Sequence, residues 1–417
     1  MHFISLWIGK LTLFWLRIFR RRGAALPGLV AEKIYPRFLS DMLEQLPEGV
    51  VVVSGTNGKT TSTKMLTAIL TASGKRVLTN PTGSNFTRGI AASVIDRSTW
   101  RGILHYDIAV IELDEAYAAK FVEHVQPKVC LILNVMRDQM DRFGEIDHTA
   151  QLLKKVVQAT TSLVVLNRDD SRVNALKKFT NAGVIFFGVS SNLRDVFRND
   201  DELHGDIYHA DDPAVVELES MRDESITLWV EDKKYTYHLS LYGVYNAQNA
   251  AAVTAVCVAL GLHPKDIGNY ISTVTPAFGR GERIQVGAKR IVLQLVKNPS
   301  GFRHALLGSE SVKTDKVMIA INDDYADGRD VSWLWDVNFL SLKDCHIMTA
   351  GVRAADMALR LHYDGIQTKD IERDLKQALK VALLQTPEDG TLLIYTTYTA
   401  MLKLRELLAT ITEVETV

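Results

Sequence analysis

Cysteine is scarce in this chain of 417 residues, and so is any excess of charge. Its three cysteines, Cys130, Cys257 and Cys345, stand far apart and form no CxxC pair, so we expect reduced thiols in a cytoplasmic protein and no zinc site. Lysine and arginine total 48 against 49 acidic residues, a net charge of −1 that gives no argument for binding nucleic acid. The length allows two or three domains.

The amino terminus is strongly apolar. Residues 2–19 surround a single Lys10 with aliphatic and aromatic side chains, and three arginines follow at 20–22. A cleaved signal peptide normally carries positive charge before its apolar part, and none precedes this one. A spanning helix would bring Lys10 into the bilayer centre at a cost of a few kcal/mol. More favoured are a helix packed on the protein's own body and an interfacial helix with its arginines on anionic headgroups.

Apolar runs alternate with amphipathic stretches from Gly49 onward. We expect buried strands at 50–53, 76–79, 108–111, 129–135 and 163–167. Such alternation is typical of α/β proteins with a parallel sheet covered on both faces by helices. We interpret the polar residues 190–235 as an insertion ending in a hairpin around 231–233, followed by a helix at 246–260. A second α/β unit is expected after a break near 279–287, with strands at 291–296, 316–321 and 344–349.

A phosphate-binding loop follows the first expected strand. Its sequence is Ser54-Gly55-Thr56-Asn57-Gly58-Lys59-Thr60-Thr61. The glycines let backbone N–H groups face phosphate oxygens, and the following helix adds its positive end. Lys59 would reach the terminal phosphates of a nucleotide and Thr60 would bind Mg²⁺. Val53 replaces the first glycine of the general GxxxxGK[ST] pattern, but the shorter GTNGKT string is more specific.

A GTPase is a minor alternative. GTPases bind guanine through an NKxD sequence, and the similar segment here, Asn167-Arg168-Asp169-Asp170, has arginine in place of the lysine.

The string GTNGKTT resembles the ATP loop of the Mur ligase superfamily, whose members join amines to carboxylates in peptidoglycan and folate synthesis. Eight further segments resemble the MurT family, the ligase-like subunits of lipid II isoglutaminyl synthase. They are LTNPTGSNFTRGIAAS (78–93), VIELDEA (110–116), NVMRDQMDRFGEID (134–147), YNAQNAAAV (245–253), GRGERIQV (279–286), LVKNPSGF (295–302), INDDYADGRDVSWLWDVNF (321–339) and GVRAADMALRL (351–361). The resemblance runs from about residue 23 to the C-terminus and implies a Mur ligase-like ATP-binding domain at 46–284 and a smaller MurT-type α/β domain at 285–417. Before them we expect a helical segment at 1–45.

The resemblance also implies a reaction. ATP phosphorylates the α-carboxylate of D-glutamate in the lipid II stem peptide, and ammonia attacks the acyl phosphate to leave D-isoglutamine. A separate glutaminase subunit, GatD, supplies the ammonia. The implied cofactors are ATP and Mg²⁺, and the implied location is the cytoplasm, at the inner membrane face, with residues 1–22 as a candidate lipid contact. The alternatives are a stand-alone amino-acid-adding Mur or folate ligase and a non-catalytic ATP-binding assembly protein.

Several residues receive nucleotide-binding roles from this resemblance. The whole loop, Gly55, Thr56, Asn57, Gly58, Lys59, Thr60 and Thr61, would hold ATP. Asn246 and Asn249 match an adenine-contacting pair, although an asparagine at a helix start can equally serve as its cap. Arg280 matches an arginine that holds nucleotide near the domain junction, and Lys297 matches a contact from the C-terminal domain.

Glu112 is the implied Mg²⁺ carboxylate together with Thr60, and Asp114 and Glu115 beside it stay open candidates. Two positions depart from related ligases. Gln139 stands where amino-acid-adding enzymes carry a histidine, and Lys154, where some carry a carbamoylated lysine, is expected on a solvated helix face. Many MurT proteins also have a four-cysteine zinc ribbon near 190–235, a segment that contains no cysteine here.

No cysteine stands in a nucleophile-elbow context, so the chain is not expected to hydrolyse glutamine itself. In the MurT family the ligase subunit contributes an aspartate that orients the partner's histidine, and Asp330 matches it. Asp327 and Asp336 are close rivals, since aspartates are common in turns.

Overall fold

The computed structural model describes residues 2–18, 25–80, 87–137, 146–199, 201–203, 205, 207–222, 224–240, 243–275, 280–309 and 314–414. The chain packs into two compact units. Unit 1 holds the described residues up to Val135, Ile146–Leu239 and Ala247–Val274, and unit 2 holds the other described residues, chiefly those from Thr275 on. The domain limits expected from the sequence stay predictions.

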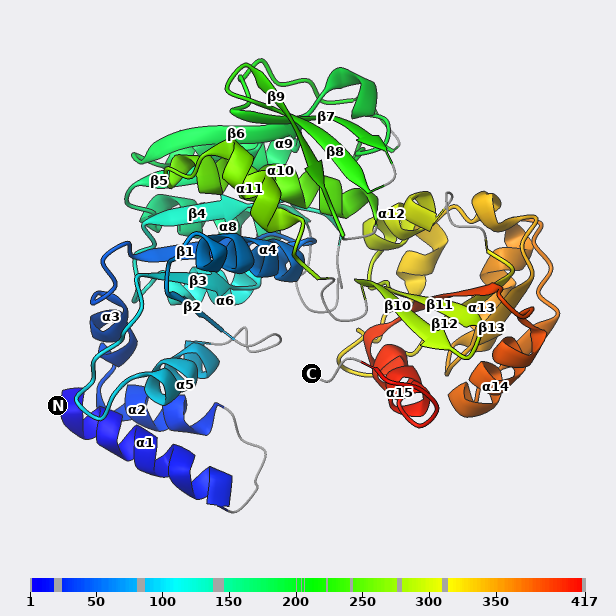
Figure 1. Cartoon of the computed structure of the whole chain (residues 1–417), viewed down its shortest axis with the longest axis horizontal. Coiled ribbons are helices and arrows are strands. Elements are labelled where there is room, and N and C mark those ends of the chain that lie inside the picture. Colours follow the sequence, from blue (N-terminus) through cyan, green and yellow to red (C-terminus); the bar gives the residue numbers. More distant parts are fainter. Residues whose placement is uncertain are drawn as a thin grey trace. The chain divides into compact units, whose positions relative to one another are not determined.

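Unit 1 is built on a nine-stranded sheet in the order β2-β3-β1-β4-β5-β6-β7-β8-β9 (Figure 1). The strands are β1 (Val50–Ser54), β2 (Val77–Thr79), β3 (Ile108–Glu112), β4 (Val129–Ile132), β5 (Leu163–Asn167), β6 (Gly183–Val189), β7 (Val216–Arg222), β8 (Ser225–Val230) and β9 (Lys233–His238). Neighbouring strands are parallel from β2 through β7 and antiparallel at β7–β8 and β8–β9. All residues of β1 are buried, as expected for a run of valines in a parallel sheet covered on both faces. The predicted α/β class is therefore confirmed, although β4 ends at Ile132, three residues earlier than expected.

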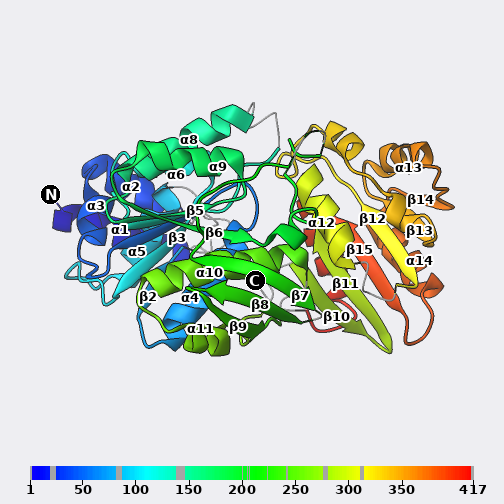
Figure 2. The ribbon, with the colours of Figure 1, turned by 90° about the horizontal axis from the view of Figure 1, so that it is seen from above.

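Helices cover both faces of this sheet. Figure 2 shows α6, α8 and α9 on one side and α4, α10 and α11 on the other. The helices are α1 (His2–Ile18), α2 (Leu26–Ile34), α3 (Phe38–Leu43), α4 (Lys59–Ala72), α5 (Thr87–Arg97), α6 (Glu115–Phe121), α8 (Ile146–Ala159), α9 (Ser171–Ala175), α10 (Val244–Ala259) and α11 (Pro264–Ile271). Among the described residues, no helix combines the length and the apolar character needed to cross a bilayer.

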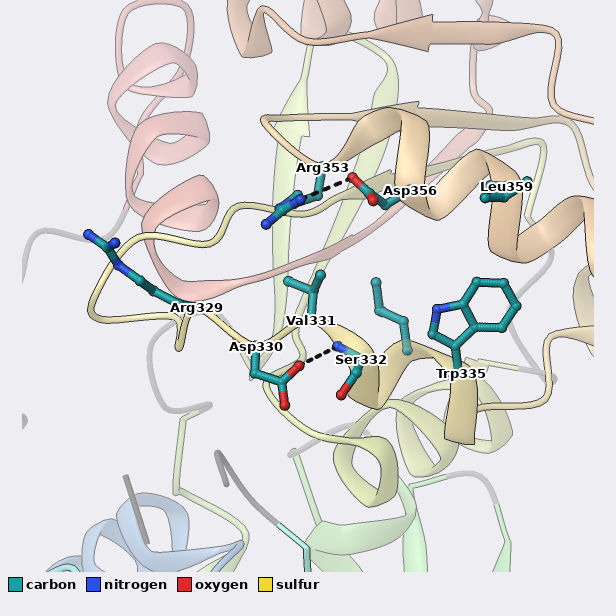
Figure 3. A pocket seen from close by; sticks show the side chains of 9 residues that line it. Arg329, Asp330, Val331, Ser332, Trp335, Arg353, Asp356 and Leu359 are labelled. Carbon is teal, nitrogen blue, oxygen red and sulfur yellow. Dashed lines mark hydrogen bonds and ion pairs between the residues drawn. The ribbon is translucent and has the colours of Figure 1, made fainter. Parts of the chain in front are cut away.

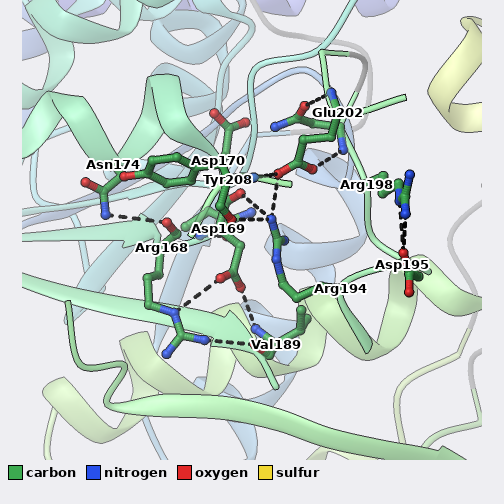
Figure 4. A network of polar contacts seen from close by, with 12 residues as sticks. Arg168, Asp169, Asp170, Asn174, Val189, Arg194, Asp195, Arg198, Glu202 and Tyr208 are labelled. Carbon is green, nitrogen blue, oxygen red and sulfur yellow. Dashed lines mark hydrogen bonds and ion pairs between the residues drawn. The ribbon is translucent and has the colours of Figure 1, made fainter. Parts of the chain in front are cut away.

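The segment expected to be an insertion continues the main sheet. Its strand β7 pairs in parallel with β6, and the predicted hairpin is formed by β8 and β9. Glu231 and Asp232 at the hairpin turn have φ angles of 46° and 67°, which gives the left-handed pair typical of a tight two-residue hairpin. Ahead of β7, Arg194 and Glu202 form a buried ion pair at 2.7 Å that holds the loop after β6 (Figure 4).

The Asn167–Asp170 segment is occupied by structural contacts. Asp169 accepts a hydrogen bond from Val189 N at 2.6 Å, and Arg168 pairs with Glu217 at 2.8 Å. Asp170 is buried and accepts three backbone hydrogen bonds: Arg172 N and Val173 N at 3.0 Å begin α9, and Val135 N at 2.7 Å fixes the chain after β4. These contacts give the segment a structural role within unit 1.

Unit 2 contains a six-stranded sheet in the order β10-β11-β15-β12-β13-β14. The strands are β10 (Arg280–Val286), β11 (Lys289–Leu295), β12 (Lys316–Ala320), β13 (Ile347–Ala350), β14 (Asp370–Glu372) and β15 (Thr391–Thr396), and the helices are α12 (Pro299–Ser309), α13 (Ala354–Tyr363), α14 (Leu375–Gln385) and α15 (Tyr398–Leu408). The three strands expected here correspond to β11, β12 and β13. The sequence analysis missed β15, the fully buried strand between β11 and β12.

We predict that Asp170→Ala lowers the free energy of unfolding by about 2–3 kcal/mol, because it leaves several buried backbone N–H groups without their acceptor. Asp374→Ala is the matched control. Asp374 also begins a helix, by accepting from Gln377 N at 2.8 Å, but it is exposed, so its loss should cost about 1 kcal/mol. Urea unfolding of both variants measures the difference, and equal losses would contradict the role given to Asp170.

The effect of Asp170→Ala should also depend on pH. Burial raises the pKa of Asp170 to about 6, against the opposing effect of the hydrogen bonds that it accepts. Because this folded pKa exceeds the unfolded value of about 4, the protonated carboxyl contributes stability below pH 4 that is lost as the pH rises through 6. The variant should therefore lose more stability at pH 5 than at pH 7.

Candidate functional site

The phosphate loop joins β1 to α4 in a conformation that only glycine tolerates at two positions. Gly55 and Gly58 have φ angles of 129° and 88°. A Cβ atom at Gly55 would lie 3.0 Å from the backbone of Asn134, and one at Gly58 would collide with the side chain of Asn249. The loop is thus held between the chain segment after β4 and the helix α10, with no room for a larger residue at either glycine.

Asn134 fixes this loop through hydrogen bonds in both directions. Its Oδ1 accepts from Asn57 N at 2.8 Å, its Nδ2 donates to Asn57 O at 3.0 Å, and its carbonyl accepts from Thr56 N at 3.0 Å. An asparagine amide can donate and accept at once, which suits it to pairing with a backbone peptide. The sequence analysis missed this role, and the position of Asn134 just beyond a buried strand was the available signal.

Four charged or hydroxyl side chains meet at the carboxyl ends of β1 and β3. Lys59 Nζ donates to the carbonyls of Gly55 and Thr56 and lies 3.7 Å from a carboxylate oxygen of Glu115. Thr60 Oγ1 donates to Glu112 Oε1 at 2.7 Å. Lys59, Glu112 and Glu115 are all buried, so their charges are compensated mainly within the site.

The three acidic residues at the end of β3 and just after it, Glu112, Asp114 and Glu115, make different contacts. Asn80 binds both backbone groups of Glu112, accepting at 2.9 Å and donating at 3.0 Å, and so fixes this residue. Asp114 caps α6 by accepting from Tyr117 N at 2.9 Å. Of the two neighbours left open by the sequence, Glu115 therefore contacts the loop lysine and Asp114 begins a helix.

These residues fit a nucleotide with a magnesium ion. The loop presents backbone N–H groups and a lysine at a helix N-terminus, the arrangement that binds phosphate. Thr60 and Glu112 offer two oxygen donors, and Mg²⁺ is usually held by one or two such groups together with phosphate oxygens and water. Across the part of the chain that the structure describes, no three histidine, cysteine, aspartate or glutamate side chains gather as a metal cage.

Of the remaining residues expected to contact the nucleotide, one lies against the phosphate loop. Asn249 lies against Gly58 and is buried, whereas Asn246 is a buried residue in the first turn of α10, two positions after the helix begins at Val244. Lys297 is half-buried between β11 and α12. Arg280 begins β10, but its side chain lies outside the described residues, as does the whole of Gln139.

Lys154 contacts an aromatic ring of its own unit. Its Nζ lies 3.8 Å from the ring centre of Phe179, a cation–π contact with the short helix that follows α9.

Asp330 lines a pocket of about 320 Å³ in unit 2. Figure 3 shows its carboxylate beside Ser332, with Arg353, Asp356 and Trp335 around the same pocket. The Asp330 side chain accepts a hydrogen bond from Ser332 N at 2.8 Å. The side chain of Ser332, and then its backbone N–H, hold the pKa of Asp330 below its ordinary value, so it is ionised at neutral pH.

The two rival aspartates have other partners. Asp327 is buried and accepts hydrogen bonds from the backbone and hydroxyl of Thr399, which ties its loop to α15. Asp336 pairs with Arg137 at 2.7 Å. Of the three, Asp330 is the one whose carboxylate lines the pocket.

Comparison with known proteins identifies relatives along most of the chain. Two family descriptions match it: "Mur ligase middle domain" at residues 53–257 and "MurT ligase C-terminal" at residues 295–401. The lipid II isoglutaminyl synthase (glutamine-hydrolyzing) subunit MurT of Staphylococcus aureus strain COL is 31% identical, with 86% of this chain and 87% of the relative covered. The subunit MurT of Streptococcus pneumoniae strain ATCC BAA-255 / R6 is 30% identical, with 93% of each covered.

Solved structures share the fold at lower identity. MurF ligase from Thermotoga maritima in complex with ADP has a TM-score of 0.70 at 15% identity, covering 91% of this chain and 84% of that one. E. coli FolC in complex with DHPP and ADP has a TM-score of 0.64 at 15% identity, covering 90% and 92%. The chain matches both family descriptions, and its relatives are similar to it over most of their length. It therefore belongs to the MurT family of Mur ligase-like proteins.

Proposed function

We propose that this chain is the ATP-dependent ligase subunit of a lipid II isoglutaminyl synthase, which converts the α-carboxylate of D-glutamate in the lipid II stem peptide to an amide during peptidoglycan synthesis. The observation that carries the proposal is the similarity to two MurT subunits over most of both chains, including the segment that matches the MurT C-terminal description. A stand-alone ligase shares the middle domain but does not account for that C-terminal match.

The chemistry has two balanced steps. An oxygen of the substrate carboxylate attacks the γ-phosphorus of ATP, and ADP leaves. Ammonia then attacks the acyl carbon, and phosphate leaves with the C–O bond broken. Lys59 and the loop N–H groups would hold the transferring phosphoryl group and stabilise its charge, as preorganised donors do. Bound Mg²⁺, held by Thr60 and Glu112, would neutralise further phosphate charge. The finer assignments of adenine to Asn246 and Asn249, and of nucleotide contacts to Arg280 and Lys297, belong to the same proposal.

The nitrogen donor is proposed to be ammonia from a GatD-like glutaminase subunit. A cysteine nucleophile must be accessible as a thiolate. Here Cys130 and Cys257 are buried, and burial raises the pKa of Cys130 to about 12 and that of Cys257 further still. Burial also raises the pKa of Cys345, which is half-buried. Asp330, ionised and lining an open pocket, would orient the histidine base of the partner, a role that needs a fixed carboxylate.

The proposed location is the inner face of the cell membrane, where residues 1–22 would contact lipid, since the substrate is carried on a lipid.

A direct test uses the purified chain with ATP, Mg²⁺, lipid II and ammonium, followed by mass spectrometry. Exchange of one OH for NH₂ supports the proposal. Addition of a whole amino-acid residue, when amino acids are supplied, would instead show a stand-alone ligase. ATP binding without any product, even after the partner glutaminase is added, would contradict the proposed amidation.

We predict that Lys59→Ala reduces ammonium-driven amidation by at least about 100-fold, because it removes the positive charge of the phosphate loop. Lys155→Ala, an exposed lysine on α8, is the control and should retain full activity. Initial rates at saturating ammonium measure both. A loss below about threefold in Lys59→Ala would refute its catalytic role.

We predict that Asp330→Asn abolishes glutamine-driven amidation but leaves ammonium-driven amidation within about twofold, because an amide keeps the Ser332 hydrogen bond and loses the charge that stabilises a histidinium. Asp356→Asn, in the same pocket, is the matched control and should retain both activities. Both rates are measured with the partner glutaminase present. Equal loss with both nitrogen donors in Asp330→Asn would exclude the orienting role.

A further inference from the structure

The first helix of the chain packs on unit 1 by one face. Leu6 is completely buried, and Ser5 Oγ donates to the carbonyl of Ala31 in α2 at 2.7 Å. A Cβ atom added to Gly9 would lie 2.8 Å from Ile95, so α1 approaches α5 closely at this glycine. Figure 1 shows α1 beside α2 and α5. The helix is therefore held in a defined orientation.

Lys10, the charge in the middle of the apolar stretch, is turned toward the protein. Its Nζ donates to the carbonyls of Ile95 and Ser98, both at 2.7 Å, at the carboxyl end of α5. A cation at this position complements the negative end of the helix dipole. The positive charge of Lys10 therefore does not lie on the outward face of α1.

The outward face of α1 is apolar along its whole length. Six large side chains, each between 48% and 60% exposed, form the α1 patch: Phe3, Trp7, Leu11, Phe14, Trp15 and Ile18. Their spacing in the helix places them on one stripe, opposite the buried Leu6 and Gly9. The patch extends to Trp100, which is 55% exposed, packs edge-on against Trp7 and accepts a hydrogen bond from its indole N–H. A surface helix of a globular protein normally presents polar residues to water, and α1 presents apolar residues on both faces.

The charge of this region indicates what covers the patch. Residues 1–31 contain Lys10, Arg17 and the three arginines at 20–22, and the first acidic residue of the chain is Glu32. The chain as a whole has a net charge of −1, so positive charge is concentrated at this end. In space, Arg17 is paired with Asp96 of α5 at 2.8 Å. An apolar face with aromatic side chains, in a segment whose sequence is rich in arginine, is typical of helices that lie in the headgroup region of an anionic bilayer.

We propose that the α1 patch inserts into the surface of an anionic lipid bilayer and anchors the chain there as a peripheral protein. The choice of a bilayer over a protein rests in part on the proposed function, because a lipid-carried substrate requires the ligase to work at a membrane surface. The inward turn of Lys10 allows the aromatic stripe to enter the acyl boundary without burying this charge. The arginine-rich sequence of the same segment favours an anionic lipid surface.

The test measures co-sedimentation of the full chain with vesicles of phosphatidylglycerol and phosphatidylcholine. The wild-type chain should bind these vesicles at least about tenfold more tightly than vesicles of phosphatidylcholine alone. Phe14→Glu and the double variant Leu11→Glu/Phe14→Glu should weaken binding at least about tenfold. Leu384→Glu is the matched control: Leu384 is 74% exposed on α14 in unit 2, and its replacement should leave vesicle binding unchanged. Unchanged melting temperatures would exclude misfolding, since all these side chains are exposed.

Three results would overturn the inference. The first is that the wild-type chain does not bind vesicles, and the second is that Phe14→Glu binds them as tightly as the wild type. The third is that light scattering shows a dimer of the wild-type chain that Phe14→Glu dissociates, while neither protein binds vesicles, which would assign the patch to a second copy of the chain.

Ammonium-driven amidation of lipid II in detergent micelles separates this inference from the proposed function. Phe14→Glu should be fully active there. Amidation in micelles without vesicle binding would reject the anchor alone. Vesicle binding without amidation, even after the partner glutaminase is added, would support the anchor and reject the function.

Discussion

The tight contact between the phosphate loop and its two flanking asparagines determines the rest of the site. Asn134 pairs with the peptide of Asn57, and Asn249 occupies the space that a side chain at Gly58 would need. With the loop fixed in this way, α4 starts at Lys59 and directs Thr60 toward the end of β3. The parallel register of β1 and β3, in which Val53 lies beside Glu112, then brings the carboxylate to the threonine. Backbone packing thus positions the groups that would handle phosphate.

Burial gives these groups their chemical character. Lys59 and Glu115 are both buried, and the Lys59 Nζ lies 3.7 Å from a carboxylate oxygen of Glu115. Asn80 holds Glu112 in place through hydrogen bonds to its backbone. Charges in such surroundings interact more strongly than they would in water, and isolating any one of them would be costly. A cluster of buried charges at the carboxyl edge of a parallel sheet is therefore better explained as a ligand site than as a source of stability, because apolar residues would pack there at lower desolvation cost.

The sequence predicts the local features and misses those that depend on tertiary contacts. Buried parallel strands are continuous apolar runs, so β1, β3 and β5 are visible in the sequence, as is the glycine-rich loop. By contrast, the role of Asn134 depends on a hydrogen bond to a residue 77 positions away. The same holds for the acidic residues: Asp114 and Glu115 are neighbours in sequence, but one begins a helix and the other contacts Lys59. The polar segment at 190–235 was expected to stand apart as an insertion, since nothing in its composition reveals that β7 pairs with β6.

Some side chains find all their partners inside the fold, whereas others remain exposed to solvent. The carboxylate of Asp327 accepts two hydrogen bonds from Thr399, so it is satisfied by its own fold. Asp330 keeps its charge at the edge of a pocket, and the α1 patch keeps six large apolar side chains in contact with water. Exposing that much apolar surface on one helix is unfavourable for the isolated chain, because each side chain loses the free energy it would gain on burial. Both exposed features are therefore the ones that we propose to be used by other molecules: Asp330 by a partner subunit and the α1 patch by a lipid surface.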